Sequence, residues 1–453
     1  MSISASGSHR PIAPGDPPSR PAPAEAGARP ITRRKLLRAG LGGAAGLAVA
    51  PALAACGGSP GDGKAKVRLW TWYTYQREQW PRLIEEFERG HPTITVEHRL
   101  FGSTDAYLPA LQAAVAGGNP PEIFAPHVLA LEYGKAGISA DLNKELGPGF
   151  LTDFIDSANQ QYTDAGSQYA VGWMAQTFGI FYNPRLLSAA GVDPPETWDE
   201  LMAAASAIKT RTASLPCVLT NNPGTNGIDF FWPLITQVTD DPGYVLRLDR
   251  LEGGARWTDP PVIAALQLVD RLVRGGTFQN GINATQTAQA EQLFYTGRAA
   301  MLFMGSWLPQ DIRQQASPEF AQLYRVTQTP SLRAGGKHWC ANQAGAGLAV
   351  SDTSGNKAAA LEFLQFLYQT ERYVQVMNDS FSMPSTKSAA ERVSDPTLQQ
   401  MTSWLLAGNG APHIPFGEGS AGTADPLAAL IGGQSSPRQT AQQMQETVER
   451  ARK

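Results

Sequence analysis

The sequence predicts an α/β fold in which helices cover a parallel sheet. Between residues 67 and 137, segments with the two-residue period of strands alternate with segments that have the 3.6-residue period of helices. The resulting order β-α-β-α-β-α is typical of a parallel sheet with covering helices. Capping and helix-ending residues fall at the ends of the same segments, which supports the assignment.

The first elements follow from apolar spacing. Apolar residues spaced three and four apart on one face predict a helix that starts at Trp80 and ends at Gly90. A second helix contains Tyr107, Leu111 and Val115, and a third ends at Gly137. The strands expected between these helices are residues 67–70, 94–98 and 122–125.

Later elements show stronger local signals. Residues 168–183 predict two strands separated near Ala175. Thr197 and Glu200 form a capping box at the start of a helix, because each side chain can bond the other residue's amide. Further strands are expected at 299–304 and 348–350, and further helices at 184–191, 259–275, 358–368 and from 437 onwards.

The N-terminal segment predicts export. Arg33 and Arg34 precede a Gly/Ala-rich apolar stretch that ends in Leu-Ala-Ala-Cys at Cys56, as in a twin-arginine signal followed by a lipoprotein cleavage site. We therefore expect residues 1–55 to be a disordered leader plus signal peptide, and 56–65 to be a lipidated tether. The protein would be exported and lipid-anchored at the outer face of the cytoplasmic membrane. The alternative is a single membrane-spanning helix over 39–55.

Length and charge narrow the class of protein. Cleavage before Cys56 leaves 398 of the 453 residues, enough for two domains with separate cores. Residues 1–55 hold seven of the 37 basic and two of the 40 acidic side chains, which leaves 30 basic and 38 acidic groups, a net charge of −8. An acidic body of this kind argues against binding to nucleic acid or to anionic lipid.

Few residues suggest catalysis or metal binding. Cys217 and Cys340 lack metal-ligand spacing and either form a disulfide or remain two buried thiols. No nucleophile elbow, phosphate loop or zinc motif occurs, so we expect no catalytic residue, metal or cofactor. Asp105 and Asp229 could form a glycosidase pair if they converged, but Asp105 more simply caps a helix.

Several blocks, taken in order, resemble a known family. The blocks begin at Trp70-Thr71-Trp72-Tyr73 and continue through Gly117-Gly118-Asn119-Pro120, Gly179-Ile180-Phe181-Tyr182-Asn183, Gly297-Arg298-Ala299-Ala300-Met301 with Gly305-Ser306-Trp307, and Gly345-Ala346-Gly347-Leu348. In this order they resemble the extracellular solute-binding proteins of bacterial ABC importers, in the carbohydrate-binding group that includes maltose-binding protein. The resemblance covers nearly all of residues 66–385.

The resemblance implies a periplasmic-binding-protein type II fold, with two α/β lobes around a ligand cleft and a hinge of several chain crossings. Lobe 1 would comprise 64–174 and 336–372, and lobe 2 would comprise 175–335 and 373–453. The crossings would lie near Ala175, Gly335 and Tyr373. Ligands of open α/β sheets bind beyond the carboxyl ends of strands, which points to the same loops.

The expected ligand residues combine aromatic rings, planar polar groups and exposed backbone. Aromatic faces suit the apolar patches of a sugar, and polar side chains suit its hydroxyls. Some residues follow predicted strands, and others match family positions that contact ligand. The predicted residues are Trp72, Tyr73, His127, Trp173, Gln176, Asp229, Trp232, Ser306, Trp307, Gly345, Ala346 and Gly347.

The resemblance implies a monomeric receptor that captures a sugar by lobe closure and delivers it to the permease subunits of an ABC importer. The family's C-terminal aromatic contact is missing, although Phe416 could replace it. An alternative is the same fold binding glycerol-3-phosphate or another non-sugar solute, which would need cations such as Lys337 or Arg325 near the ligand. A tethered enzyme acting on polysaccharide is the third possibility.

Overall fold

The computed structural model describes residues 63–222, 226–412 and 422–451. Residues 58–453 form one compact unit. The predicted export residues Arg33 and Arg34, the lipidated Cys56 and the alternative span at 39–55 lie outside the described residues, as does Phe416. Within the part of the chain that is described, no helix is both long and apolar enough to cross a membrane.

The described strands form one mixed sheet of nine strands and a separate two-stranded ribbon, β4–β5. The strand order is β2-β1-β3-β10-β6-β8-β7, with β11 beside β10 and β9 beside β6. Strands β1, β2 and β3 are parallel, as predicted, whereas β10 runs antiparallel to both β3 and β6. The strands are β1 (Ala65–Thr71), β2 (Ile94–Leu100), β3 (Ile123–Phe124), β4 (Thr163–Asp164), β5 (Ser167–Gln168), β6 (Val171–Tyr182), β7 (Leu215–Val218), β8 (Ala299–Gly305), β9 (Arg325–Thr327), β10 (Cys340–Val350) and β11 (Gly410–Pro412).

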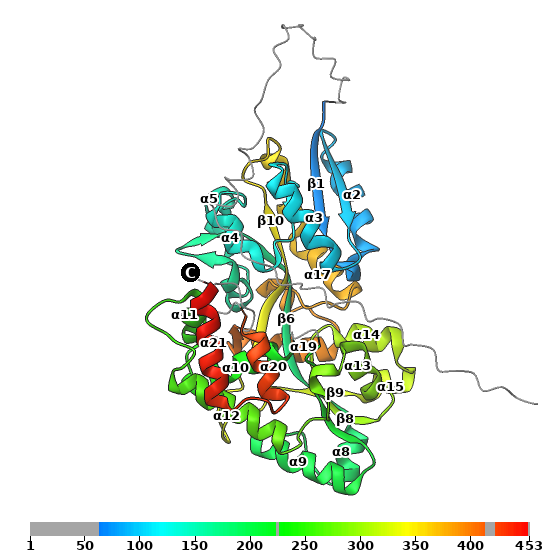
Figure 1. The fold of residues 1–453 in the computed structure, drawn as a ribbon. Coiled ribbons are helices and arrows are strands. Elements are labelled where there is room, and N and C mark those ends of the chain that lie inside the picture. Colours follow the sequence, from blue (N-terminus) through cyan, green and yellow to red (C-terminus); the bar gives the residue numbers. More distant parts are fainter. Residues whose placement is uncertain (1–62, 223–225, 413–421, 452–453) are drawn as a thin grey trace, which may run out of the picture. The chain divides into compact units, whose positions relative to one another are not determined.

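Helices surround the sheet, which confirms the α/β prediction (Figure 1). They are α2 (Gln79–Gly90), α3 (Thr104–Ala116), α4 (Ala130–Lys135), α5 (Leu142–Leu146), α6 (Pro148–Leu151), α7 (Asp156–Asn159), α8 (Pro184–Ala190), α9 (Trp198–Arg211), α10 (Asn226–Thr239), α11 (Pro242–Arg250), α12 (Pro260–Arg274), α13 (Thr287–Tyr295), α14 (Leu308–Gln315), α15 (Pro318–Leu323), α16 (Lys357–Leu367), α17 (Thr370–Asp379), α18 (Lys387–Ala390), α19 (Pro396–Leu406), α20 (Ala424–Ile431) and α21 (Pro437–Ala451). Four short 3-10 helices complete the described elements: η1 (Thr74–Gln76), η2 (His127–Leu129), η3 (Gln160–Tyr162) and η4 (Ile282–Ala284).

Helix caps explain several of these boundaries. Both bonds of the predicted capping box between Thr197 and Glu200 are present at the start of α9. At the start of α3, Ser103 is the cap, because its hydroxyl accepts from the Ala106 amide at 3.3 Å. The prediction that Asp105 caps this helix was wrong. Asp105 lies within the first turn, where the helix dipole stabilises its negative charge.

The central strand β6 is continuous, although the sequence predicted two strands separated near Ala175. The Ala175 amide donates to the Met383 carbonyl at 2.9 Å, so the backbone stays extended there. What changes near this point is the partner, because β6 pairs with β10 up to Thr177 and with β8 and β9 beyond it. Figure 1 shows β6 running from the part that contains β1 to the part that contains β8.

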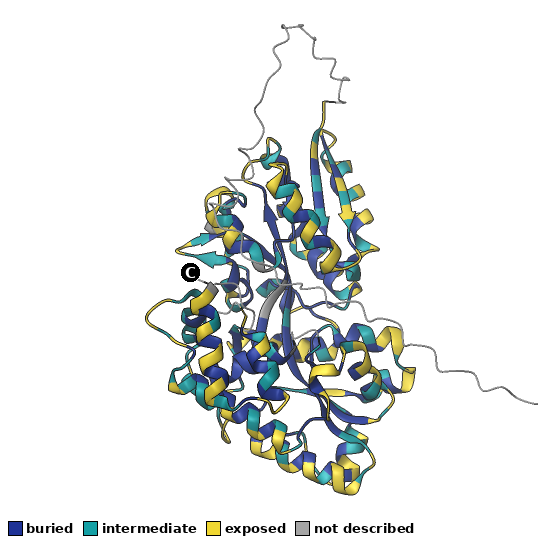
Figure 2. Cartoon of the chain, viewed as in Figure 1, coloured by how far each residue is buried: buried dark blue, intermediate teal, exposed yellow. Residues whose placement is uncertain are grey.

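The buried apolar residues form three clusters. Figure 2 shows buried residues, in dark blue, along the central strands. The first lies around β1, β2 and β3 and includes residues of β10, α16 and α17. The second surrounds α9, α10 and α12, and the third lies around β8, α14 and α19. The first cluster extends to Ala389, beyond the predicted lobe boundary at residue 372. The lobe ranges remain a prediction.

The two cysteines of the described region are unpaired. Cys217 and Cys340 are both free and fully buried. Burial raises the pKa of the Cys217 thiol to about 12 and that of Cys340 to about 11. Of the two alternatives left open by the sequence, the structure shows buried thiols.

Candidate functional site

An aromatic group lies where β1 and β3 end. Trp72 is half-buried, and its ring centre lies 5.0 Å from that of Tyr73 and 5.3 Å from that of His127. His127 has a positive φ of 51°, a conformation that non-glycine residues rarely adopt. Burial lowers the pKa of its imidazole to about 4, so the ring is neutral at physiological pH. Its Nδ1 is buried and has no hydrogen-bond partner among the residues that the structure describes.

Tyr73 connects this group to β10. Only 2% of Tyr73 is exposed, and its hydroxyl donates to the Gly347 carbonyl at 2.5 Å. At this point β10 has a bulge, because Gly345 and Ala346 both face Met174 of β6. A Cβ on Gly347 would lie 2.5 Å from the Tyr162 hydroxyl, so this close packing requires glycine. Tyr73 and the three predicted backbone residues therefore form one packed unit.

Gln176 and Ser306 lie where β6 changes partner. Gln176 is half-buried and lies opposite Gln343 of β10. Ser306 follows β8 directly, and its amide donates to the Thr177 carbonyl at 2.9 Å. Its hydroxyl accepts from the Thr177 amide at 3.4 Å. Ser306 is thus fixed by a backbone bond and a side-chain bond to β6, next to Gln176.

Trp307 is held over the end of β8. It is half-buried, and its ring meets Phe178 edge-on, with ring centres 5.2 Å apart. A Cβ on Gly305 would lie 2.1 Å from the Trp307 ring, so only glycine allows the ring to fold back over the strand. The ring is therefore fixed in position but keeps part of its surface exposed.

The other predicted residues lie deeper. Trp173 is fully buried and stacks on Trp80, with ring centres 5.1 Å apart. Trp232 is 1% exposed and packs against Trp257 at 5.3 Å. Asp229 is buried in the first turn of α10, where the helix dipole favours its negative charge. Both tryptophan rings belong to the core and present no open face in this structure.

A group of four residues whose charges affect one another was missed by the sequence analysis: Tyr75, Glu291, Tyr295 and Asp311. Glu291 and Tyr295 are one turn apart on α13, and Asp311 is one turn after Trp307 on α14. Burial, with the charge of Asp311 second, raises the pKa of Glu291 to about 7, and burial raises that of Asp311 to about 6. Burial and these two carboxylates also raise the pKa of Tyr75, which follows β1. The residue Tyr75 in the loop after β1 is therefore close enough to α13 and α14 to be affected by their carboxylates.

The four-residue spacing of Trp307 and Asp311 could have signalled this group. The same holds for Glu291 and Tyr295, because residues four apart share a helix face. That α13, α14 and the loop after β1 approach one another depends on tertiary structure, and no local pattern shows it. The Tyr295 hydroxyl is buried beside the Glu291 carboxylate, and this burial, followed by the carboxylate, raises the pKa of that hydroxyl.

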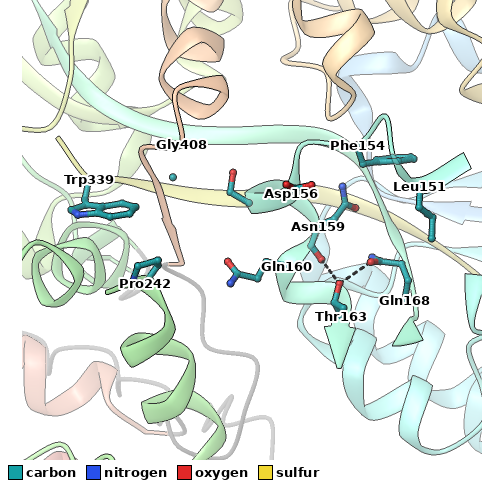
Figure 3. A pocket seen from close by; sticks show the side chains of 12 residues that line it. Leu151, Phe154, Asp156, Asn159, Gln160, Thr163, Gln168, Pro242, Trp339 and Gly408 are labelled. Atoms are coloured by element: carbon teal, nitrogen blue, oxygen red, sulfur yellow. Dashed lines mark hydrogen bonds between the residues drawn. The ribbon is translucent and has the colours of Figure 1, made fainter. Parts of the chain in front are cut away.

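A cavity of about 410 Å³ lies elsewhere, and none of the predicted ligand residues lines it. Figure 3 shows residues between Leu151 and Gln168 on one side and Pro242 and Trp339 on the other. Two of its polar side chains are engaged internally: Asn159 accepts from the Gly172 amide at 2.8 Å, and Gln168 accepts from the Thr163 hydroxyl at 2.7 Å. We therefore place the candidate site at the strand ends and not in this cavity.

The cations proposed for an anionic ligand are engaged elsewhere. The Lys337 ammonium lies 3.6 Å from the centre of the Trp339 ring. Arg325 donates to three carbonyls at the end of α15. Across residues 63–222, 226–412 and 422–451, no group of three or more His, Cys, Asp or Glu side chains could hold a metal ion.

Comparison with known sequences identifies related proteins. Residues 73–372 match the family model described as bacterial extracellular solute-binding protein. A putative binding protein of Brucella abortus is 22% identical over 87% of this chain and 94% of its own length. A diacetylchitobiose-binding protein of Streptomyces coelicolor is 23% identical over 49% of this chain and 48% of its own. A Brucella abortus glycerol-3-phosphate-binding periplasmic protein is 30% identical over 47% of this chain and 48% of its own.

Solved structures share the fold. A family 1 extracellular solute-binding protein from Bifidobacterium longum subsp. infantis has a TM-score of 0.70 at 20% identity, covering 86% of this chain and 100% of its own. A chitin oligosaccharide binding protein has a TM-score of 0.71 at 22% identity, and the match covers 86% of this chain and 99% of that protein. These matches confirm the predicted periplasmic-binding-protein type II fold. The matched family and both structures are described as binding proteins and not as enzymes.

Proposed function

The chain belongs to the family of bacterial extracellular solute-binding proteins, and we propose that its solute is a sugar, specifically an oligosaccharide. The sugar would bind between two lobes and would then be delivered to the permease of an ABC importer. One observation carries the proposal: two partly exposed tryptophans, Trp72 and Trp307, lie at the ends of β1 and β8, and the carboxylate Asp311 lies one turn after the second.

This combination suits the chemistry of a sugar. The apolar C–H faces of a pyranose pack on indole rings, and its hydroxyls donate to carboxylates. Glu291, which is buried, and Asp311, which is half-buried, supply acceptor oxygens. Each half contributes one ring, so closure would enclose the sugar between them.

The similar proteins support a sugar and leave one alternative. Two of them bind, by their names, diacetylchitobiose and chitin oligosaccharide. The relative that binds glycerol-3-phosphate favours the alternative solute. Against that alternative, a phosphate beside Glu291 and Asp311 would be repelled, and Arg325 and Lys337 already have other partners.

A thermal-shift screen of the purified protein tests the proposal. The panel would contain mono-, di- and trisaccharides, N,N′-diacetylchitobiose and glycerol-3-phosphate. A ligand present at 100 times its Kd stabilises a fold by about 2.7 kcal/mol, a shift of a few degrees. Stabilisation by a saccharide that is lost in Trp307→Ala supports the proposal. Stabilisation by glycerol-3-phosphate alone would replace it with the alternative, and release of hydrolysis products would favour an enzyme.

We also propose the lobe assignment given by the resemblance, 64–174 with 336–372 and 175–335 with 373–453. The partner change of β6 near Ala175 supports this boundary. The predicted ligand residues Tyr73, Gly345, Ala346 and Gly347 would position the others through the packed bulge, with Gln176 and Ser306 at the crossing. The protein would act as a monomer.

Export and anchoring complete the proposal. Arg33 and Arg34 would direct export, and Cys56 would hold the lipid that tethers the protein outside the cytoplasmic membrane. Cys56→Ala should release the exported protein into the medium, whereas retention at the membrane would contradict lipidation. Replacing both arginines with lysine should block export; unchanged export would indicate a different route.

A further inference from the structure

The cavity of about 410 Å³ has the size of a small-molecule site. Pockets that bind small molecules measure roughly 300 to 1,000 Å³, so this cavity lies near the lower end of that range. None of the residues that we assign to the candidate ligand site lines it, so it is a separate space. Its size suits a single sugar ring or a polyol better than a long oligosaccharide.

Segments far apart in the sequence form the cavity. Residues between Leu151 and Gln168 line one side, and Gly408 and Gly410 contribute backbone alone near β11. A Cβ on Gly410 would lie 3.0 Å from the Ser157 Oγ, so β11 approaches α7 closely through its backbone. The walls of the cavity are therefore set by tertiary packing.

Trp339 supplies a fixed apolar surface on the other side of the cavity (Figure 3). Its indole nitrogen donates to an Asp240 carboxylate oxygen at 2.9 Å, and the Lys337 ammonium lies 3.6 Å from its ring centre. The ring is thus held from two directions before any ligand arrives. Pro242 extends the same side, so the C–H groups of a ligand would meet apolar atoms there.

Two polar side chains of the lining are available to a ligand. The Gln160 amide points toward the side of Trp339 and Pro242 (Figure 3), and it forms no hydrogen bond within the described residues. The Ser157 hydroxyl is buried at the wall and also lacks a partner in that part of the chain. An unpaired buried hydroxyl costs stability, and a ligand that bonded it after rotation about one side-chain bond would remove that cost.

The lining carries almost no charge. Asp156 is the one charged residue among those that line the cavity, all of which the structure describes. Its carboxylate is almost fully exposed and pairs with Lys387 at 3.5 Å, so solvent and that ammonium screen it. A charged ligand would lose hydration here without gaining an opposite charge. The chemistry of the walls therefore suits a neutral ligand.

We propose that this cavity is a second binding site for a small neutral molecule with several hydroxyl groups, of the size of a monosaccharide or a polyol. Gln160 and Ser157 bond its hydroxyls, and Trp339 contacts its C–H groups. The inference goes beyond the proposed function and does not depend on it, because the two sites share no residue.

Fluorine NMR of the full chain labelled with 5-fluorotryptophan tests both sites in one spectrum. Trp307 and Trp339 are two of the ten tryptophans, and their signals are assigned by their loss in Trp307→Phe and Trp339→Phe. The neutral probes are glucose, N-acetylglucosamine, myo-inositol and glycerol. Gluconate and glucosamine at pH 6 are the charged controls.

The Trp339 signal should shift, and the shift should saturate, with at least one neutral probe. The probe that gives the shift distinguishes a sugar ring from an open-chain or cyclic polyol. The absence of a saturable Trp339 shift with every neutral probe overturns the proposal. An equal shift with gluconate and glucosamine contradicts a site for neutral molecules.

Substitutions in the lining locate the binding. Gln160→Ala should weaken the Kd of that probe about three- to tenfold, because it removes one hydrogen-bonding side chain. Gln365→Ala, at an exposed position of α16, is the matched control and should leave the Kd unchanged. Ser157→Leu should abolish the shift by filling the cavity; if that variant fails to fold, Gln160→Ala decides. An unchanged Kd in Gln160→Ala contradicts the proposal.

Trp307→Ala separates the two sites. The response of the Trp339 signal should persist in this variant, because Trp307 does not line the cavity. Loss of that response in Trp307→Ala would mean that the signal reports the candidate ligand site, and the second site would then be rejected. Saccharides that shift the Trp307 signal alone support the proposed function and overturn the second site, whereas a shift of the Trp339 signal alone has the opposite meaning.

Discussion

Trp307 and Asp311 lie one turn apart at the start of α14, where the Asp311 amide donates to the Trp307 carbonyl at 3.4 Å. Because residues four apart lie on one side of a helix, the two side chains start from the same side of the α14 terminus. One helix terminus thus presents an apolar surface and a hydrogen-bond acceptor together. This pairing fits a ligand that has both C–H faces and hydroxyl groups.

Trp307→Ala should weaken saccharide binding about 10- to 100-fold, since it removes the partly exposed ring that would stack on the sugar. Isothermal titration with the saccharide identified by the thermal screen measures the change in Kd. Trp307→Phe keeps an aromatic face and should recover part of the affinity. Equal affinity in all three proteins would exclude stacking on this ring.

The pair Glu291 and Asp311 should make stability depend on pH. Their pKa values are raised to about 7 and about 6, so the folded protein keeps protons that the unfolded chain loses between about pH 4 and 7. The free energy of unfolding should therefore fall as pH rises through this window, by roughly 1 to 3 kcal/mol.

Urea unfolding at pH 5 and pH 8 measures this effect. Glu291→Gln should reduce the loss of stability at pH 8, because the neutral amide has no charge to bury. Glu252→Gln, at an exposed position after α11, should leave the pH dependence unchanged. If the parent protein were as stable at pH 8 as at pH 5, or if Glu291→Gln showed the same pH dependence as the parent protein, the proposed burial of charge would be contradicted.

Local patterns predicted most elements because they depend on residues close in the sequence. The capping box at Thr197 and the helix face containing Trp80 need only a few neighbouring residues. β6 was predicted less well. Its residues pair with β10, β8 and β9, all far along the chain, so the change of partner near Ala175 looked like a break in the strand.

The burial of residues in the candidate site also depends on residues distant in the sequence and could not be predicted from local patterns. Trp173 and Trp307 are both tryptophans near glycine, yet only the first is enclosed, by rings from Trp80, Tyr368 and Tyr373. Those rings lie before and well after it in the sequence, so burial could not be judged from its neighbours. Trp307 was easier to predict as a ligand residue, because the local block Gly305-Ser306-Trp307 marks it.

The buried thiols should be chemically silent in the folded protein. Burial raises the pKa of Cys217 to about 12 and of Cys340 to about 11, so almost no thiolate forms at pH 8. With Cys56→Ser as background, Ellman's reagent should detect no thiol in native protein and two after unfolding in guanidinium. Two thiols that react at once in native protein would contradict burial, and none after unfolding would indicate a disulfide.

Gly305→Ala should displace the Trp307 ring without removing it. The added Cβ would lie 2.1 Å from the ring, so the indole must rotate away from the strand end. We expect a loss of saccharide affinity close to that of Trp307→Ala, with a cost in stability of about 1 to 3 kcal/mol from overpacking. Gly102→Ala is the matched control, because nothing lies within 4 Å of its Cβ position. Affinity in Gly305→Ala equal to that of Gly102→Ala would show that the ring's present orientation does not matter for binding.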